Sequence, residues 1–284
     1  MSKIEYDLDV PIKDLTTYKT QGNLPVVVSP KTIGQCKYLL EKFNKLNLSY
    51  FVIGKGSNLL ISPQTAKICI NLSKMHKKIK INGDFLTVSS NTPLSQLYIS
   101  CKEAGLIGIE KACTIPASVG GFIKNNASFM GQDAFSHLEK ITMLHEDKII
   151  TLKKSQCVYS YRHTQLPSGI IISATFRLKQ QNSETVAKSY HEAILYRNEI
   201  QPKGFSCGCV FKNPEGYSAG NLIDQCGLKG KRKGGAIISQ KHANFIINEA
   251  NATFDDVKYL IDYCKEEVQS KFNVLLEEEV EIIH

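Results

Sequence analysis

The stretch "SCGCVFKNPEG" at residues 206–216 places two cysteines, Cys207 and Cys209, one residue apart among glycines. A thiol there could be a metal ligand, half of a disulfide, a packed small apolar group or a group that reacts with a substrate. No second Cys pair or His pair supplies the other half of a zinc site, so we expect no metal. The nine cysteines are an odd number, spread through a chain too long to depend on disulfides, and we expect most to be reduced and buried. For Cys209 this leaves packing and reactivity as the open interpretations.

Two glycine-containing segments, "VIGKGSNLLIS" at 52–62 and "TIPASVGGFIKNNAS" at 114–128, share a second chemistry. Glycines let backbone N–H groups approach phosphate oxygens, and the hydroxyl and amide side chains add donors. No helix directly follows the first segment, so it is not the dinucleotide fingerprint of a Rossmann fold. A tight turn would explain either segment alone. Together they predict one extended cofactor that carries phosphate.

Carboxylates concentrate near the C-terminus, in "VLLEEEVEII" at 274–283. We predict a strand here, in which alternation by two places Glu277, Glu279 and Glu281 on one face and Glu278 on the other.

Elements that would position these groups follow from hydrophobic spacing. Strand and helix signals alternate without a fixed repeat, which favours mixed α and β layers. Residues 25–54 predict a β-α-β unit whose helix is capped by Thr32. Its predicted apolar face comprises Ile33, Cys36, Leu40, Phe43 and Leu46. Short strands should follow at 68–73, 79–81 and 85–90, with a type I′ turn at Asn82–Gly83.

Farther along the chain, Pro93 should open a helix that stops at Gly105, and 106–136 reads as irregular. Strand patterns resume in "ITMLHEDKIITL" and "GIIISATFRL", and 183–200 reads as a helix. Beyond it we expect a helix in "AGNLIDQCG", a strand in "NFIIN" and a long helix starting at Thr253. That helix would bury Val257, Leu260, Ile261, Cys264 and Val268. We also assign Cys36, Cys101 and Cys264 to the core, because each lies in an apolar helical pattern.

The 284 residues carry 35 Lys and Arg against 27 Asp and Glu, a formal charge of +8 that favours anionic ligands. The basic residues are scattered and form no stripe interleaved with aromatic residues, so we expect no nucleic-acid partner. The N-terminus lacks a secretory pattern, and no apolar run reaches the roughly 18 residues of a membrane span. We therefore expect a cytoplasmic protein without a membrane partner.

Five segments in order make a more specific identification possible. They are "VIGKGSNLLIS", "GIEKACTIPASVGGFIKNNASFMG", "YSYRHTQL", the stretch from Ser206 to Asn248, and "LEEEVEII". Together they resemble the UDP-N-acetylenolpyruvoylglucosamine reductase family over nearly the whole chain, and "HANFIIN" resembles its shorter subclass, which lacks an inserted tyrosine-bearing loop.

The resemblance implies an α+β fold, with a two-subdomain FAD-binding scaffold of the PCMH (vanillyl-alcohol-oxidase-like) type and a third α+β subdomain that binds substrate. The implied division is 1–66 and 67–182 for the FAD-binding subdomains, 183–200 for a connecting helix and 201–284 for the substrate-binding subdomain. The end of the last strand would return to the first subdomain.

The implied reaction uses non-covalent FAD and NADPH as co-substrate to reduce a UDP-sugar enolpyruvyl ether to UDP-N-acetylmuramate, a peptidoglycan precursor. Hydride passes from flavin N5 to the terminal enolpyruvyl carbon, and the enolate-like product then needs stabilising charge and a proton at C2. Arg162 and Glu279 match the family residues near the substrate carboxylate, where Glu279 must be protonated. Cys209 matches the position at which many members have the proton-donating serine. A thiol there is a better acid than an alcohol.

The resemblance also implies binding residues. The cofactor residues would be Ile53, Gly54, Lys55, Gly56, Ser57, Asn58, Thr114, Ile115, Pro116, Ala117, Ser118, Gly120 and Gly121. The substrate residues would be Tyr161, Lys212, Asn213 and His242, although a packing role explains His242 almost as well. Lys55 departs from the family, which has glycine there, and Lys124 has no role that we can assign. We expect a monomer.

Two alternatives remain at this stage. The first is another FAD oxidoreductase on the same scaffold, such as a sugar or hydroxy-acid oxidase, against which "GCVFKNP" and "HANFIIN" count. The second is a basic, non-enzymatic binding protein, which a purified colourless protein would support.

Overall fold

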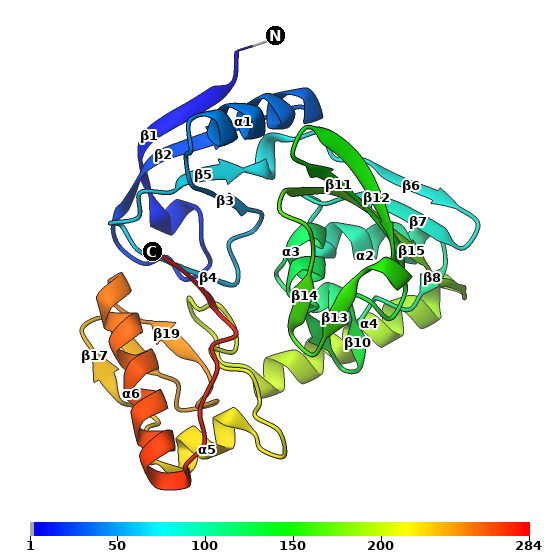
Figure 1. Ribbon diagram of the computed structural model, residues 1–284. Helices are drawn as coiled ribbons and strands as arrows, with labels where there is room; N and C mark the ends of the chain where they lie inside the picture. The colour runs from blue at the N-terminus through cyan, green and yellow to red at the C-terminus, as the bar shows by residue number, and fades with distance from the viewer. Residues whose placement is uncertain (1–2) are drawn as a thin grey trace. The chain divides into compact units, whose positions relative to one another are not determined.

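The computed structural model describes residues 3–284, which form two compact units. Unit 1 comprises the chain up to Asp7, Val27–Lys55 and Lys67–Arg197, and unit 2 comprises Leu8–Val26, Gly56–Ala66 and Asn198–His284. The elements of both are labelled in Figure 1. Helices and antiparallel and parallel strands occur together, which confirms the predicted α+β class.

A four-stranded sheet has the order β1-β2-β5-β3. Its strands are β1 (Glu5–Pro11), β2 (Asn23–Ser29), β3 (Tyr50–Ile53) and β5 (Ile68–Asn71), and β5 runs parallel to both β2 and β3. Helix α1 (Ile33–Lys45) connects β2 to β3, and the Thr32 Oγ1 accepts a hydrogen bond from the Gln35 N–H at 3.2 Å. The β-α-β prediction is confirmed, but Ile33 and Leu46 are exposed, so the buried face of α1 is narrower than predicted.

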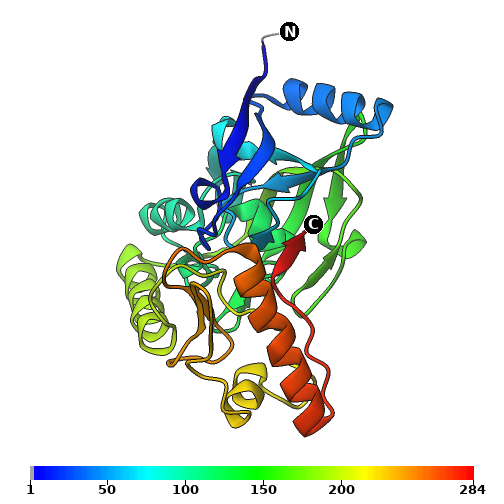
Figure 2. The same ribbon diagram turned by 90° about the vertical axis from the view of Figure 1, so that its left-hand side faces the viewer.

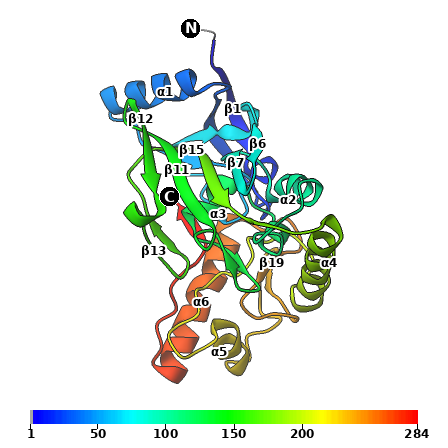
Figure 3. The ribbon, with the colours of Figure 1, turned by 90° about the vertical axis from the view of Figure 1, so that its right-hand side faces the viewer.

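The larger sheet of unit 1 is antiparallel, with the order β12-β11-β15-β7-β6, and Figure 3 shows these strands side by side. The strands are β6 (Ile79–Asn82), β7 (Phe85–Ser89), β11 (Leu138–His145), β12 (Lys148–Lys153) and β15 (Ile170–Arg177). Helices α2 (Leu94–Glu103) and α3 (Val119–Lys124) pack their apolar residues into the same core as Leu86 and Phe176 of the sheet. The predicted β6–β7 hairpin is confirmed, although Asn82 pairs with Phe85 and the turn falls on Gly83–Asp84.

Two local predictions in this unit need correction. Pro93 caps α2 and does not open it, because its ψ of 140° is extended. The stretch 106–136, predicted to be irregular, contains α3, whose N-cap is Ser118.

The remaining elements of unit 1 are short, apart from α4, which extends into unit 2 as predicted. They are η2 (Leu72–Lys74), β8 (Leu106–Ile107), η3 (Ala112–Thr114), β9 (Ser128–Phe129), β10 (Gln132–Asp133), η4 (Lys154–Gln156), β13 (Val158–Ser160), β14 (His163–Gln165), β16 (Lys179–Gln180) and α4 (Ser183–Ile200).

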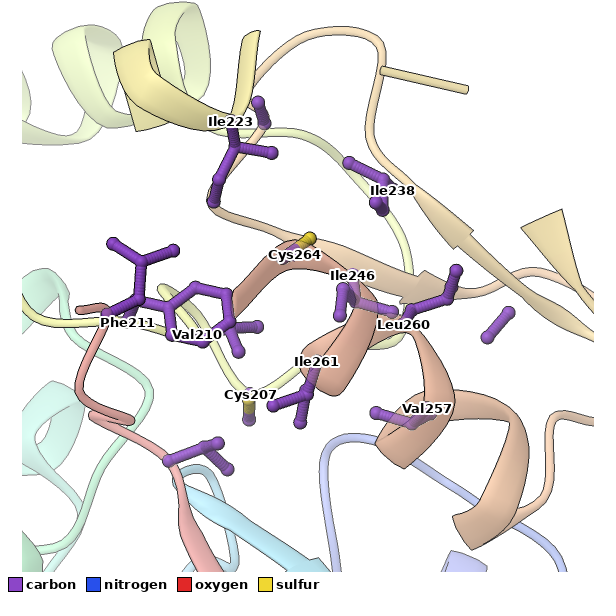
Figure 4. Packing of buried hydrophobic residues seen from close by; sticks show 14 of the residues in the cluster. Cys207, Val210, Phe211, Ile223, Ile238, Ile246, Val257, Leu260, Ile261 and Cys264 are labelled. Carbon is purple, nitrogen blue, oxygen red and sulfur yellow. The ribbon is translucent and has the colours of Figure 1, made fainter. Parts of the chain in front are cut away.

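Unit 2 is built around α6 (Phe254–Phe272), drawn in orange in Figure 2. The face that the sequence predicts, from Val257 to Val268, is buried against α5 (Ala219–Gln225) and a three-stranded sheet, β17-β18-β19. Cys207, Val210 and Phe211 belong to this core, as Figure 4 shows. The other elements are η1 (Ile12–Asp14), β4 (Leu59–Ile61), β17 (Arg232–Lys233), β18 (Ala236–Ile238), β19 (Ile246–Asn248) and β20 (Glu281–Ile283).

The predicted strand over 274–283 is wrong for most of its length. Only β20 is a strand, and it pairs in parallel with β4 through Glu281 and Leu59. Over the predicted range 274–283 the buried residues are Leu276, Val280 and Ile283, a spacing that does not alternate by two. The cause is non-local, because Glu277–Val280 exchange backbone hydrogen bonds with 210–212 and turn before reaching β4.

Cys36, Cys101 and Cys264 are each buried to 2% exposure or less, which confirms their assignment to the core. All nine cysteines are free, and only Cys209 and Cys226 are partly exposed. Within residues 3–284, no helix is long and apolar enough to cross a membrane.

Candidate active site

The two glycine-containing loops predicted to bind cofactor meet inside unit 1. A Cβ added to Gly54 would lie 2.2 Å from the Ser118 Oγ, so only glycine permits this approach. Ser118 in turn caps α3, because its Oγ accepts from the Gly121 N–H at 3.4 Å. Residues from 53–55 and 114–121 are therefore neighbours in space although they lie 60 residues apart in the sequence.

Donors are available around these loops for a phosphate-bearing group. Among the residues that the structure describes, the Lys55 N–H donates to no protein acceptor, whereas the Gly120 N–H is used internally, on the Ser90 carbonyl at 2.7 Å. The Thr92 Oγ1 is buried without a hydrogen-bond partner in the described chain, and the Thr92 carbonyl accepts from the Val119 N–H. Orphaned buried polar atoms are rare in native proteins, and they fit a site completed by a ligand.

The first loop also positions the C-terminal segment of unit 2. The Asn58 Nδ2 donates to the Glu279 carbonyl at 2.9 Å, and the Glu281 N–H donates to the Asn58 carbonyl at 3.0 Å. Gly56 has a φ of +60°, and a Cβ there would lie 2.1 Å from the Leu15 carbonyl oxygen. Asn58, predicted as a cofactor residue, thus uses its side-chain amide to hold the Glu279 backbone.

Arg162 lies at the tip of the β13–β14 hairpin, where Ser160 pairs with His163 and residues 161 and 162 form the turn. Its φ of +53° is left-handed, which costs a non-glycine residue about 1 kcal/mol. The Arg162 Nη1 donates to the Ser128 Oγ at 2.6 Å and Nη2 donates to the Ser128 carbonyl at 3.3 Å. Two donors to one residue fix the plane of the guanidinium group.

The same hairpin is tied to α3. The Thr164 Oγ1 donates to the Ile123 carbonyl at 2.9 Å, and the Asn126 Nδ2 donates to the Ser160 carbonyl at 2.9 Å. Helix α3 begins at the loop that contains Ser118, so Arg162 and the second predicted cofactor loop share one support.

Cys209 and Glu279 lie on neighbouring segments of unit 2. The Glu279 N–H donates to the Val210 carbonyl at 2.8 Å, and the Lys212 N–H donates to the Glu277 carbonyl at 2.9 Å. Cys209 is half-buried and packs against the small apolar cluster of Ile237, Phe245 and Ile247. The structure therefore brings together two of the three predicted catalytic residues within one unit.

Cys207 has a different environment from Cys209. It is 6% exposed and lies against the ring of Tyr18 in the core. Burial raises the pKa of the Cys207 thiol well above its usual range. Cys207 is thus a packed, protonated thiol, and Cys209 is the cysteine available for chemistry.

The carboxylates beside Glu279 have partners at the surface. Lys212 forms an ion pair with Glu277, and the Lys265 Nζ lies 2.8 Å from the Glu278 Oε1. Burial alone would raise the pKa of Glu278, but the hydrogen bond and charge of Lys265, a backbone hydrogen bond and the charge of Lys258 together outweigh burial and lower the pKa. Lys212, predicted to bind substrate, thus has a carboxylate partner.

Two further predicted substrate residues, Asn213 and His242, support α5. The Asn213 Oδ1 accepts from the Ala219 N–H at 3.0 Å, and the His242 ring lies beside Gly220, where a Cβ would be 3.1 Å from Cε1. The His242 Nδ1 accepts from the Asn244 N–H at 3.2 Å, which leaves the proton of the neutral ring on Nε2. Burial lowers the pKa of His242, so the neutral form is favoured.

Asn244 is a positioning residue that the sequence did not single out. It is 3% exposed, its Oδ1 accepts from the Phe211 N–H at 2.9 Å and its Nδ2 donates to the Phe211 carbonyl at 2.8 Å. This pair of hydrogen bonds fixes the backbone two residues after Cys209. "HANF" contained the residue, but only the fold shows which segment it holds.

Known proteins resemble this chain in both parts. Residues 24–150 match the family model described as an FAD binding domain, and residues 201–283 match the C-terminal domain of UDP-N-acetylenolpyruvoylglucosamine reductase. The UDP-N-acetylenolpyruvoylglucosamine reductase of Bacillus subtilis is 35% identical over 279 residues, which cover 96% of this chain and 92% of the relative. That of Anoxybacillus flavithermus is 37% identical over 274 residues, covering 94% and 91%. The crystal structure of the Thermus caldophilus reductase aligns with a TM-score of 0.84 at 32% identity, covering 99% of both chains.

Proposed function

Because the chain belongs to the UDP-N-acetylenolpyruvoylglucosamine reductase family, we propose that it reduces UDP-N-acetylglucosamine enolpyruvate to UDP-N-acetylmuramate with electrons from NADPH. It is an FAD-dependent oxidoreductase of peptidoglycan precursor synthesis. The observation that carries the proposal is the similarity over both parts of the chain, which includes the segments of Cys209, Arg162 and Glu279. We place the reaction in the cytoplasm and expect a monomer, which size-exclusion chromatography with light scattering would test.

The residues of unit 1 fit FAD at the loops around Gly54 and Ser118, where the Lys55 N–H and the Thr92 hydroxyl are available. When bound, FAD supplies a hydride from N5 to the terminal carbon of the enolpyruvyl group. Neither loop contains His or Cys, the usual tethers of covalent flavins, so the FAD should be released on denaturation. Flavin that remained with precipitated polypeptide would contradict non-covalent binding.

We assign the proton at C2 to the Cys209 thiol. Hydride addition places negative charge on C2 and its carboxylate, and the fixed charge of Arg162 would stabilise it. Glu279, protonated, would donate to the same carboxylate. Ser128 holds the Arg162 guanidinium, and Asn58 holds the Glu279 backbone.

A spectrum followed by two half-reactions tests the proposal. The purified protein should show flavin absorbance, lose it when NADPH is added without oxygen, and regain it when the enolpyruvyl nucleotide is added. Bleaching without reoxidation by that nucleotide would favour a sugar or hydroxy-acid oxidase on the same scaffold. A colourless protein that cannot be reconstituted with FAD would instead favour the non-enzymatic binding protein.

The variant Glu279→Gln separates the role of this carboxyl group from a structural one. Reduction by NADPH should stay near the parent rate, while reoxidation by substrate slows, because the acid acts only after hydride transfer begins. Glu281→Gln is a matched control, since Glu281 is an exposed carboxylate two residues away. Equal slowing of both half-reactions by Glu279→Gln would mean that Glu279 only supports the segment.

A further inference from the structure

The five-stranded sheet of unit 1 has a polar face opposite its core. Successive strand residues point to opposite faces, and Leu86 and Val88 of β7 and Phe176 of β15 are fully buried in the core. Thr87 and Thr175 therefore point to the other face, where their hydroxyls lie 3.0 Å apart.

The strand registers place one residue from each strand in a continuous row across this face. Lys153 pairs with Lys140, Lys140 with Thr175, Thr175 with Thr87, and Thr87 with Lys80. With about 4.8 Å between strands, the row spans roughly 19 Å. It contains three ammonium groups and two hydroxyls and no carboxylate.

All five residues of the row line a hollow of ≈ 1450 Å³, which Arg177, Lys154 and Lys179 also line. The acidic residues of the hollow are Asp84 and Glu139. In the chain from residue 3 onwards, none of the six cations takes part in an ion pair. The hollow thus has an excess of four positive charges that protein carboxylates do not neutralise.

The pair Lys140 and Lys153 is an unfavourable arrangement that an anion would stabilise. Like charges directly opposite each other on neighbouring strands destabilise a sheet, since their Cβ atoms lie about 5 Å apart. We propose that the row from Lys153 to Lys80 is a binding site for an anionic small molecule that carries two or more phosphate groups. Such a ligand would neutralise the lysine pair at one end and reach Lys80 at the other.

Phosphate fits the row better than carboxylate does. The row offers point charges and hydroxyl donors, both of which bind phosphate oxygens without a preferred plane. Carboxylate recognition favours the planar fork of arginine, and the one arginine of the hollow, Arg177, lies over the Phe85 ring at 5.7 Å and outside the row. A concave surface suits a small molecule, whereas a specific protein partner usually buries about 800 Å² on each side.

Inorganic tripolyphosphate is a suitable probe, and calorimetric titration of the FAD-loaded protein at fixed ionic strength is the measurement. We expect one site per chain, and the double variant Lys140→Gln/Lys153→Gln should bind at least about tenfold more weakly, because two charge-assisted contacts are lost. The matched control is Lys42→Gln/Lys45→Gln, which removes the same charge from the exposed surface of α1. It should bind within about twofold of the parent.

Each other outcome overturns the proposal. If the parent protein does not bind tripolyphosphate, there is no such site. If both double variants bind it equally weakly, net charge alone causes the weakening. Binding that disappears when UDP-N-acetylmuramate saturates the protein would assign the probe to the active site. Equal affinity for a glutamate oligomer of the same charge would replace the phosphate ligand by an acidic peptide. Both double variants change exposed side chains, and thermal unfolding should show that they fold like the parent.

Discussion

Cys209 differs from a serine by one atom, and that atom sets the acidity of the group. If the thiol protonates C2, Cys209→Ser should retain substantial activity, because a hydroxyl can occupy the same place. Cys209→Ala should slow the substrate half-reaction by about 10²- to 10⁴-fold, the usual contribution of general acid catalysis. Reduction of the flavin by NADPH should be unchanged in both variants, which stopped-flow absorbance would measure.

A second thiol nearby calls for its own control. Alkylation should mimic alanine in the parent enzyme and spare Cys209→Ser, and Cys207→Ala would show whether Cys207 modification contributes. Because Cys207 is buried and its pKa is raised by that burial, we expect little contribution. An alanine variant at position 209 that reduces the enolpyruvyl nucleotide at the parental rate would remove Cys209 from the mechanism.

His242 should make the protein less stable in acid. Burial lowers its pKa in the folded protein, so the unfolded chain binds the proton first as the pH falls. The free energy of unfolding therefore falls as the pH drops below about 6.5, the pKa of histidine in the unfolded chain. It stops falling once the pH is below the pKa of His242 in the folded protein. In His242→Gln, the free energy of unfolding measured with urea should depend less on pH between about pH 7 and pH 5 than it does in the parent. If the variant loses as much stability in acid as the parent does, groups other than His242 cause that loss.

The family resemblance assigned roles to individual side chains but not to their partners. Cys209, Arg162 and Glu279 were assigned through that resemblance and their catalytic roles stay predictions, while the structure places Cys209 and Glu279 on adjacent segments. Ser128 and Asn244 gave no signal in the sequence, and Asn58 was predicted only as a cofactor residue, because the hydrogen bonds that these three residues make reach 33 or more residues along the chain. Their roles as positioning residues appear only after folding.

The segment that contains Cys209 depends on Asn244 for its shape. Asn244→Ala leaves the Phe211 N–H and carbonyl buried without their partner, which should cost about 2–4 kcal/mol in urea unfolding. It should also slow the substrate half-reaction while sparing reduction by NADPH. Asn248→Ala is the matched control, since Asn248 is equally buried and its Nδ2 donates to the Tyr18 and Lys19 carbonyls. Equal kinetic defects in both variants would mean that loss of stability alone is responsible.

Elements with local signals were predicted well. The Thr32 cap, the α4 range and the buried face of α6 all depend on residues within one or two helical turns. The prediction of one strand over 274–283 was wrong because the backbone of this segment pairs first with residues 210–212 and then, after a bend, with β4. Helix α3 was missed because its six residues are too few to show a helical spacing of apolar residues. Ser118, three residues before Gly121, was nevertheless a usable capping signal.

Strand order explains why scattered lysines form one surface. Lys80, Lys140 and Lys153 lie far apart in the sequence, and the order β12-β11-β15-β7-β6 places them in one row. A linear search for basic stripes could not detect this, since the row draws one residue from each of five strands.

The net charge of +8 should speed the capture of anionic substrates. NADPH and a UDP-sugar both carry several negative charges, and a positive field raises their association rates but leaves the bound state unaffected. Raising the ionic strength from about 10 mM to about 100 mM shortens the Debye length from about 30 Å to about 10 Å. We expect kcat/KM for NADPH to fall several-fold over this range, while the rate constant for flavin reduction at saturating NADPH stays constant.

Variants of charges far from the active site distinguish the effect of the net charge from the effect of contacts in the active site. Lys42→Glu/Lys45→Glu on α1 removes half of the net charge without changing a predicted site residue. At low salt it should lower kcat/KM for NADPH, and at high salt it should match the parent, because the remaining attraction is screened. If kcat/KM for NADPH depends on salt equally in parent and variant, charges within the active site cause the salt dependence. A change in the saturating rate constant would instead mean that α1 influences the flavin through structure.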